Sequence, residues 1–421
     1  MRPESGTSIW HNGAFVRVWT AATVSIFGSL ITRLALPYVA ILVLAAGPLE
    51  VAGLRSAEIV AGLMFGLLAG AWVDRLRRRP VLVVADAGRA VLLGSVPVAA
   101  LGGWLTLAQL LVVAFGAAIF TAFFDAADPA YLPTTVQRAD LVRANAAIAA
   151  SASAAEVTAF GLAGFLVAAL TAPIAIAVDA LSFLVSGLLL GSIRQSEPSP
   201  PPAEDREPVM TEIRAGFRLL AGDPIVRSLA MARVIGGLSN GVFGGLWLVF
   251  VSRELGLAPI AVGLIAAVGG AAALGGAWLV GGLARRWSIG RVLVVSLGMS
   301  AAASLAIPLA PAAIPLAAAG LLVFAQLAGD SSATVFEILE ASVRQTRVGD
   351  RGLGRVSASI RTSALLFELI GALTAGVVAE AFGLRIAIAL APATALAAAA
   401  YLWRSPVRSL REASPAPVPL D

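Results

Sequence analysis

The sequence of 421 residues contains no cysteine, no lysine and only one histidine, His11. Without cysteine the chain can form no disulfide, no iron–sulfur cluster and no thiolate zinc site. A single histidine in a polar N-terminal stretch argues against imidazole metal sites and Ser-His-Asp catalysis. All 30 basic residues are arginine, and no GxxxxGK[ST] motif occurs, so a Schiff-base lysine and a phosphate-binding loop are excluded. The sequence predicts neither an enzyme nor an ATP-driven pump, and we expect no cofactor and no metal.

Charge is scarce in this chain. Charged residues make up 13% of the sequence and hydrophobic residues 59%, and the mean hydropathy is +0.90. Soluble domains contain about 25% charged and roughly 45–50% apolar residues. A chain this apolar would expose large apolar patches to water, so we expect its partner to be the lipid bilayer.

Twelve apolar stretches, divided by polar breaks, are long enough to cross a membrane as helices, which takes about 20 residues each. They lie near 15–45, 49–73, 80–103, 105–128, 140–171, 173–193, 225–252, 258–284, 291–311, 313–340, 356–382 and 384–403. The abundant glycine and alanine suit close packing of helices in lipid. The sequence therefore predicts an all-α integral membrane protein with two six-helix bundles.

A proline-rich run from Glu197 to Pro208 separates the two sets of six spans. Such a run cannot form a buried helix and is typical of a flexible linker. After it, Ile213, Phe217 and Leu220 alternate with charged residues in a pattern that predicts a short amphipathic helix on the inner surface. We expect four parts: the N-terminal bundle (1–194), the linker with its helix (195–222), the C-terminal bundle (223–404) and a disordered cytoplasmic tail (405–421).

The arginines predict the orientation. With the N-terminus inside, almost all arginines outside the spans fall at the cytoplasmic ends, and only Arg55, Arg253 and Arg385 fall at the outer ends. Such a bias is the positive-inside pattern of membrane proteins. It places both termini in the cytoplasm and explains the pI near 10.7 without nucleic-acid binding.

The two halves of the chain repeat each other with an offset of 211 or 212 residues. The matches are Gly70 with Gly281, Arg75 with Arg286, the run 81–84 with 292–295, Asp125 with Glu337, Asp128 with Glu340, Arg143 with Arg355 and Glu156 with Glu368. Charges that recur at one offset, in segments with few charges, indicate a duplicated six-helix unit, a common plan among secondary transporters.

The segment Gly70–Arg79 reads GAWVDRLRRR and resembles the signature loop between helices 2 and 3 of the major facilitator superfamily, G-x-x-x-D-R-x-G-R-R. The segment Gly281–Arg291 reads GGLARRWSIGR and resembles its second copy, with the acid replaced by arginine. Further pieces are similar to the branch that holds the enterobactin exporter and macrolide efflux pumps. These are Phe123-Phe124-Asp125, Arg143-Ala-Asn145-Ala, Asp179-Ala-Leu-Ser-Phe183 and Gly354-Arg355-Val356.

The resemblance implies gate residues at the cytoplasmic ends of the helices. In the family, an acid at the position of Asp74 contacts the N-terminus of helix 11, whose partial positive charge favours a carboxylate. Asp125 would contact Arg75 or Arg79, and Glu337 would contact Arg286 in the same way. The alternative is that these are structural salt bridges with no part in switching.

Glu156 and Glu368 are the candidates for proton coupling. Each lies roughly 20 Å along its helix from Arg143 or Arg355, at 1.5 Å per residue, and so close to the middle of the membrane. An acid at that depth is costly unless it is paired or protonated, and is a functional candidate by default.

Candidate partners for these two acids are Arg33, Arg233 and Arg361, the arginines predicted to carry charge in the cavity. A permanent pair that joins the two halves is the alternative. Two other groups are expected to be structural, namely the i, i+3 pair of Asp86 and Arg89, and Asp179.

The resemblance implies a protein of the cell membrane that exports a small hydrophobic or amphipathic compound (drug, siderophore or secondary metabolite) by alternating access. Its other expected partner is the proton, as the driving ion, and we expect a monomer. An uptake permease or uniporter for a small solute remains an alternative, as does a non-transporting membrane sensor or scaffold. A fold alone does not identify the cargo.

Overall fold

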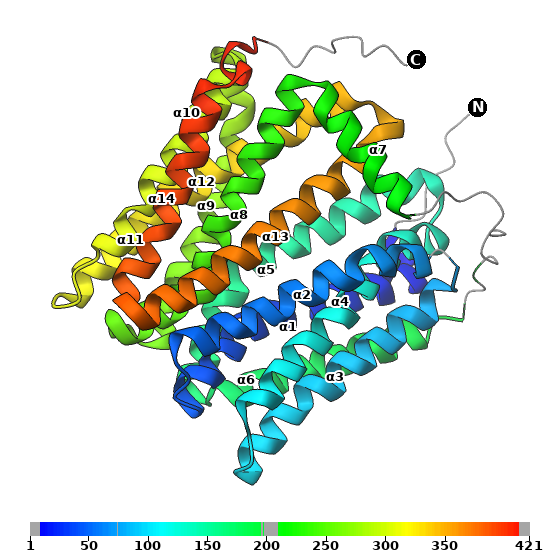
Figure 1. The fold of residues 1–421 in the computed structure, drawn as a ribbon. Helices are drawn as coiled ribbons and strands as arrows, with labels where there is room; N and C mark the ends of the chain where they lie inside the picture. The colour runs from blue at the N-terminus through cyan, green and yellow to red at the C-terminus, as the bar shows by residue number, and fades with distance from the viewer. Residues whose placement is uncertain (1–8, 74, 195–196, 198–208, 412–421) are drawn as a thin grey trace, which may run out of the picture. The chain divides into compact units, whose positions relative to one another are not determined.

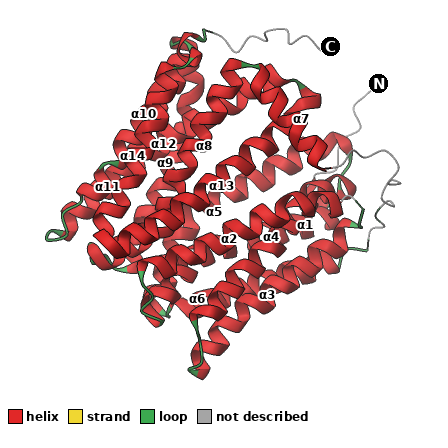
Figure 2. Ribbon diagram, viewed as in Figure 1, coloured by secondary structure: helices red, strands yellow, loops and turns green. Residues whose placement is uncertain are grey.

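The computed structural model describes residues 9–73, 75–194, 197 and 209–411. Within them all regular structure is helical (Figures 1 and 2). The α-helices are α1 (Gly13–Tyr38), α2 (Pro48–Val73), α3 (Arg78–Gly102), α4 (Leu107–Thr135), α5 (Leu141–Ala169), α6 (Ala172–Gly191), α7 (Val209–Gly222), α8 (Pro224–Val249), α9 (Pro259–Arg286), α10 (Ile289–Ser304), α11 (Ala306–Leu309), α12 (Pro315–Val348), α13 (Asp350–Phe382) and α14 (Leu384–Arg404).

Eleven of the helical segments in the described residues are long and apolar enough to cross a membrane. The helix α2 also has the length of a membrane span, since its 26 residues extend about 39 Å at 1.5 Å each, and its stretch 59–73 carries no charge. The predicted all-α membrane architecture is confirmed. The helices α4 and α12 run seven and eight residues past the spans expected at 105–128 and 313–340, since hydropathy marks only the apolar part of a helix.

The contacts between helices divide the chain into two compact units. Unit 1 comprises Met1–Ala45 and Val60–Glu204, and unit 2 comprises Ala46–Ile59 and Asp205–Asp421. The division falls inside α2, so that the first part of this helix belongs to unit 2.

In unit 1, α6 packs against both α1 and α3. The helix α1 also contacts α5, and α3 also contacts α4. Phe15, Leu82 and Tyr131 are fully buried in its core. Gly28 of α1 lies so close to α6 that a Cβ atom at this position would collide with the side chains of Asp179 and Ser182. A glycine is therefore required where these two helices meet.

In unit 2, α8 packs against α13 and α14, and α12 packs against α9 and α10. Two glycines permit the closest approaches. Gly241 of α8 lies against the backbone of Glu368 in α13, and Gly276 of α9 lies against the backbone of Ser331 in α12. Small residues let membrane helices approach to this distance, and the approach of α8 to α13 fixes the place of Glu368.

The helices α1 and α8 end alike, each in a π-helical turn, at Val39–Val43 and Phe250–Glu254. Leu44 N donates to Val39 O in the first turn, and Leu255 N donates to Phe250 O in the second. Each residue of the second turn follows its counterpart by 211, the offset at which the sequence repeats. Because π-turns are rare, this coincidence is structural support for the repeat.

Candidate functional site

Unit 2 contains a cavity of about 580 Å³, within the range of roughly 300–1,000 Å³ that small-ligand sites have. Its walls come mainly from α8, α10, α12, α13 and α14. Alanines, glycines, Leu297, Phe336 and other apolar residues make up more than half of the lining. The polar lining residues are Arg233, Ser239, Asn240, Ser300, Ser304, Asp330, Glu337, Arg344, Ser357, Arg361 and Glu368.

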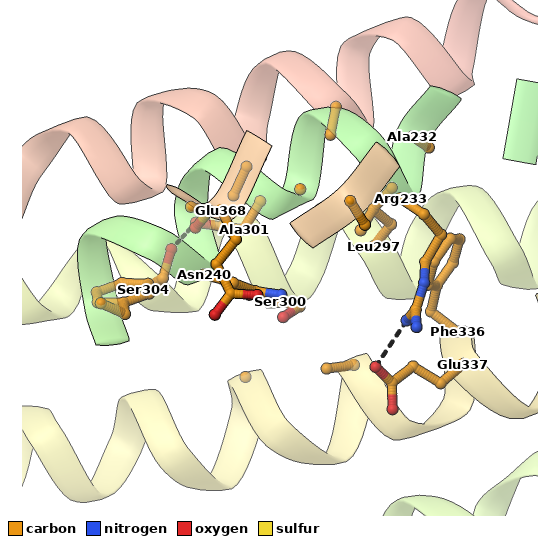
Figure 3. A pocket seen from close by; sticks show the side chains of 18 of the residues that line it. Ala232, Arg233, Asn240, Leu297, Ser300, Ala301, Ser304, Phe336, Glu337 and Glu368 are labelled. Atoms are coloured by element: carbon orange, nitrogen blue, oxygen red, sulfur yellow. Dashed lines mark hydrogen bonds and ion pairs between the residues drawn. The ribbon is translucent and has the colours of Figure 1, made fainter. Parts of the chain in front are cut away.

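Arg233 of α8 and Glu337 of α12 form an ion pair across this cavity, with Nη1 2.8 Å from Oε1 (Figure 3). Glu337 thus pairs with Arg233 and not with Arg286, the partner expected from the sequence. Gly269 and Gly276 of α9 lie against Gln326 and Ser331 of α12, so the two helices run parallel. Arg286 is the exposed last residue of α9. It therefore lies beside the part of α12 that follows Glu337 in the chain, and not beside Glu337 itself.

Glu368 of α13 also lines the cavity, and its partner is Arg55, with Oε1 2.5 Å from Nη2. Arg55 lies in the part of α2 that belongs to unit 2 and also pairs with Glu58 at 2.8 Å. Arg233, one of the partners expected from the sequence, pairs with Glu337 instead. Arg55, expected only as an arginine at the outer end of a helix, is thus the ion-pair partner of Glu368. Its i, i+3 spacing to Glu58 is the one local signal that it belongs to a charged group within a span.

Two further charged groups line the same cavity. Arg344 pairs with Glu340 one turn earlier in α12, with 3.1 Å between the charged atoms. Asp330 lies on α12 opposite Gly269, and the exposed Arg361 lies on α13. Arg361 is thus one of the charged residues that line the cavity of unit 2.

The signature loop of unit 1 is held by the end of α6 and by Glu197. Arg79 donates from Nε to Leu190 O at 3.0 Å and from Nη2 to Gly191 O. The carboxylate of Glu197 accepts from the backbone amides of Arg78 and Arg79 at 2.8 and 3.2 Å. The side chain of Arg79 thus binds carbonyls at a helix C-terminus, where cations are favoured, rather than Asp125.

The other expected gate and coupling residues are spread over unit 1. Asp74 lies outside the described residues. Arg75 is exposed just beyond α2, Asp125 is exposed on α4, Arg33 is exposed on α1 and Glu156 is exposed on α5.

Asp86 and Arg89 of α3 form the i, i+3 pair predicted from the sequence, with Oδ1 2.5 Å from Nη2. Asp86 is completely buried and Arg89 is 3% exposed. The guanidinium of Arg89 lies between the rings of Phe124 and Phe183, at 4.3 and 4.1 Å from their centroids. This sandwich provides cation–π contact to a charge that has lost its water.

The sequence model of the Major Facilitator Superfamily matches residues 18–350, which is most of the chain and includes both copies of the repeat. The chain belongs to this superfamily. Its family and fold are those of transporters and not of enzymes. No curated protein matches this member of the superfamily by sequence.

Solved structures of other major facilitator proteins share the fold. A bacterial homologue of the human lysosomal transporter Spinster, in an inward-facing and unoccupied conformation, has a TM-score of 0.74 at 15% identity and covers 96% of this chain and 99% of its own. The nucleoside transporter NupG has a TM-score of 0.74 at 13% identity, covering 93% and 99%. A bacterial homologue of the iron transporter ferroportin, in an inward-facing state, has a TM-score of 0.76 at 19% identity, covering 94% and 99%.

Proposed function

We propose that the protein is a secondary active transporter of the cell membrane that exports a small hydrophobic or amphipathic compound in exchange for protons. The observation that carries the proposal is the position of Glu368. It lies on the wall of the cavity in unit 2 and forms an ion pair with Arg55 inside helices that cross the membrane. A carboxylate at that depth is expensive to maintain without function.

The cavity suits a cargo that is apolar over most of its surface and polar at a few points. Apolar side chains supply contact area, and the hydroxyls of Ser300 and Ser304 and the amide of Asn240 supply hydrogen bonds. Small-ligand sites combine an apolar wall with a few polar groups in this way. The motifs that resemble the enterobactin exporter and macrolide pumps favour export over uptake.

Glu368 is suited to couple protons to cargo because Arg55 also forms an ion pair with a second acid, Glu58. When Glu368 takes up a proton and leaves the pair, Arg55 keeps its contact with Glu58, so the arginine is not left as an unpaired charge. Loss of the proton restores the pair at 2.5 Å. Glu156, at the equivalent position of the repeat, is the second candidate.

Charged side chains near the cytoplasmic ends would then act as gates. We assign this role to the ion pair of Glu337 with Arg233 and, in unit 1, to Asp74, Arg75, Arg79 and Asp125. Arg33, Arg233 and Arg361 would supply charge to the transport route. The same proposal treats 1–194 and 223–404 as the two bundles joined by the linker 195–222. The tail expected at 405–421 does not begin as a disordered segment, because Val407 and Leu410 are buried against α10, where Gly290 N donates to Leu410 O at 2.9 Å.

Proteoliposomes with a fluorescent amphipathic dye and a pH step across the membrane test the proposal. The wild-type protein should move the dye against its gradient toward the acidic side. Glu368→Gln, which imitates the protonated state, should abolish this pH-driven uptake and retain exchange of dye between equal concentrations. Glu156→Gln tests the second candidate.

The matched control is Glu254→Gln. Glu254 pairs with Arg385 at 3.4 Å and does not line the cavity, so this variant should respond to pH like the wild type. Proton coupling at these glutamates is wrong if both Glu368→Gln and Glu156→Gln keep the full pH-driven uptake. An uptake permease would accumulate the dye in the opposite direction.

A further inference from the structure

In the core of unit 1, two buried acids, Asp86 and Asp179, lie near one buried arginine, Arg89. Asp86 and Arg89 already form a close ion pair on α3, and Asp179 of α6 lies next to them with no exposed surface. Arg89 is the cation that acts on Asp179, and Asp86 is the other charge near it. Two buried carboxyl groups thus share one guanidinium.

The other elements around Asp179 contribute hydroxyl groups and acids. The helix α1 contributes the hydroxyl of Thr32, and α6 itself contributes that of Ser182. On α4, the acids Asp125 and Asp128 lie farther out and face Arg89. The helix α5 carries Glu156, which is exposed.

The hydrogen bonds of Asp179 point to the same imbalance. Its Oδ1 accepts from Ser182 Oγ at 2.9 Å. Its Oδ2 has no hydrogen-bond partner in the described part of the chain, and neither has the hydroxyl oxygen of Thr32 close by. A buried carboxylate oxygen without a donor is unfavourable, and this pair of oxygens needs one hydrogen between them, which either the Thr32 hydroxyl or a proton on Asp179 can supply.

Close packing limits what could neutralise Asp179. Gly28 of α1 touches both Asp179 and Ser182 so tightly that even a Cβ atom would collide with them. The rings of Phe124 and Phe183 cover Arg89 on both sides. A hydrated metal cation needs more room than this contact between α1 and α6 leaves, and a proton needs none.

We propose that Asp179 is a proton-binding site of the N-terminal bundle, neutral while α1 packs on α6 and ionised only when this contact opens to water. Asp86 differs from it in forming the close ion pair with Arg89. The site is separate from Glu368, lies in the other unit, and does not depend on which cargo the protein carries.

Infrared spectroscopy of the purified full chain in lipid nanodiscs tests this proposal, because a protonated carboxyl has a C=O stretch apart from the bands of carboxylates and amides. At neutral pH the wild type should show this band, and transfer to D₂O should shift it. Asp179→Asn should remove a part of the band. The control Asp140→Asn should leave it unchanged, since Asp140 is partly exposed and 3.8 Å from Arg143.

Ser182→Ala decides the outcome if Asp179→Asn does not fold. This variant removes the hydrogen bond to Asp179 Oδ1, so the band should move to higher frequency without loss of area. A wild-type spectrum without a protonated-carboxyl band would overturn the proposal. So would a band that neither Asp179→Asn nor Ser182→Ala alters, because it would then belong to another acid. A transport assay plays no part in this test, so the proposal can fail while proton coupling at Glu368 stands, and the reverse.

Discussion

At the scale of single residues, Arg55 holds two acids from one position. Its Nη1 pairs with Glu58 and its Nη2 with Glu368. The side chain of Glu368 is only 13% exposed, so its carboxylate has exchanged most of its water for this arginine. The two residues therefore depend on this pair to different degrees. Arg55 has a second ion-pair partner, whereas Arg55 is the one cation that pairs with Glu368 among the ion pairs of the described residues.

This asymmetry predicts unequal effects of the two substitutions. Arg55→Ala should lower the free energy of unfolding by about 2 kcal/mol, the order of cost for a largely buried charge that loses its partner. Glu368→Gln should cost less, because Arg55 keeps Glu58. The double variant Arg55→Ala, Glu368→Gln should regain most of the loss. Thermal unfolding in detergent measures all three, and a double variant as unstable as Arg55→Ala would contradict the explanation.

Sequence could predict one of the two main ion pairs and not the other. Asp86 and Arg89 are three residues apart on one helix, and helical geometry places such side chains together. Arg55 and Glu368 are 313 residues apart, and no local pattern relates them. The long-range pair depends on how α2, α8 and α13 pack, and that follows from close contacts such as Ala52 with Gly245 and Gly376.

At the scale of elements, adjacent glycines of α9 have opposite surroundings. A Cβ atom on Gly276 would collide with the backbone carbonyl of Ser331 in α12, whereas one on Gly275 would meet open space. Gly276→Ala should therefore force α9 and α12 apart and lower the unfolding temperature. Gly275→Ala should be neutral or stabilising by up to about 1 kcal/mol, because alanine is the better helix former.

Melting curves of these two variants, measured in the same detergent, give the comparison. The same chemical change occurs one residue apart on one helix, so propensity and hydrophobicity are matched. Equal melting temperatures for the two variants would show that the contact between α9 and α12 can widen without cost.

Most helices were predictable, because uninterrupted apolar runs of this length have few alternatives to a membrane helix. The π-turns that end α1 and α8 were not, since hydropathy does not distinguish their hydrogen-bond pattern from that of an α-helix. The full length of α12 to Val348 was also missed, because its last turns are polar.

At the scale of the whole molecule, the distribution of arginine predicts the side of each loop. Cysteine labelling can test this directly, since the chain has no cysteine of its own. Ala312→Cys, between α11 and α12, should react with a membrane-impermeant maleimide on intact cells. Ala139→Cys, between α4 and α5, should react only after permeabilisation. Both positions are exposed alanines, so reactivity reports on sidedness, and the reverse pattern would invert the proposed topology.

The matching π-turns at Val39–Val43 and Phe250–Glu254 bear on the history of the gene. An extra residue inserted independently into two helices would have no reason to occur at one common offset. A single irregular turn, already present in one bundle before that bundle was copied, accounts for both turns and for their common offset.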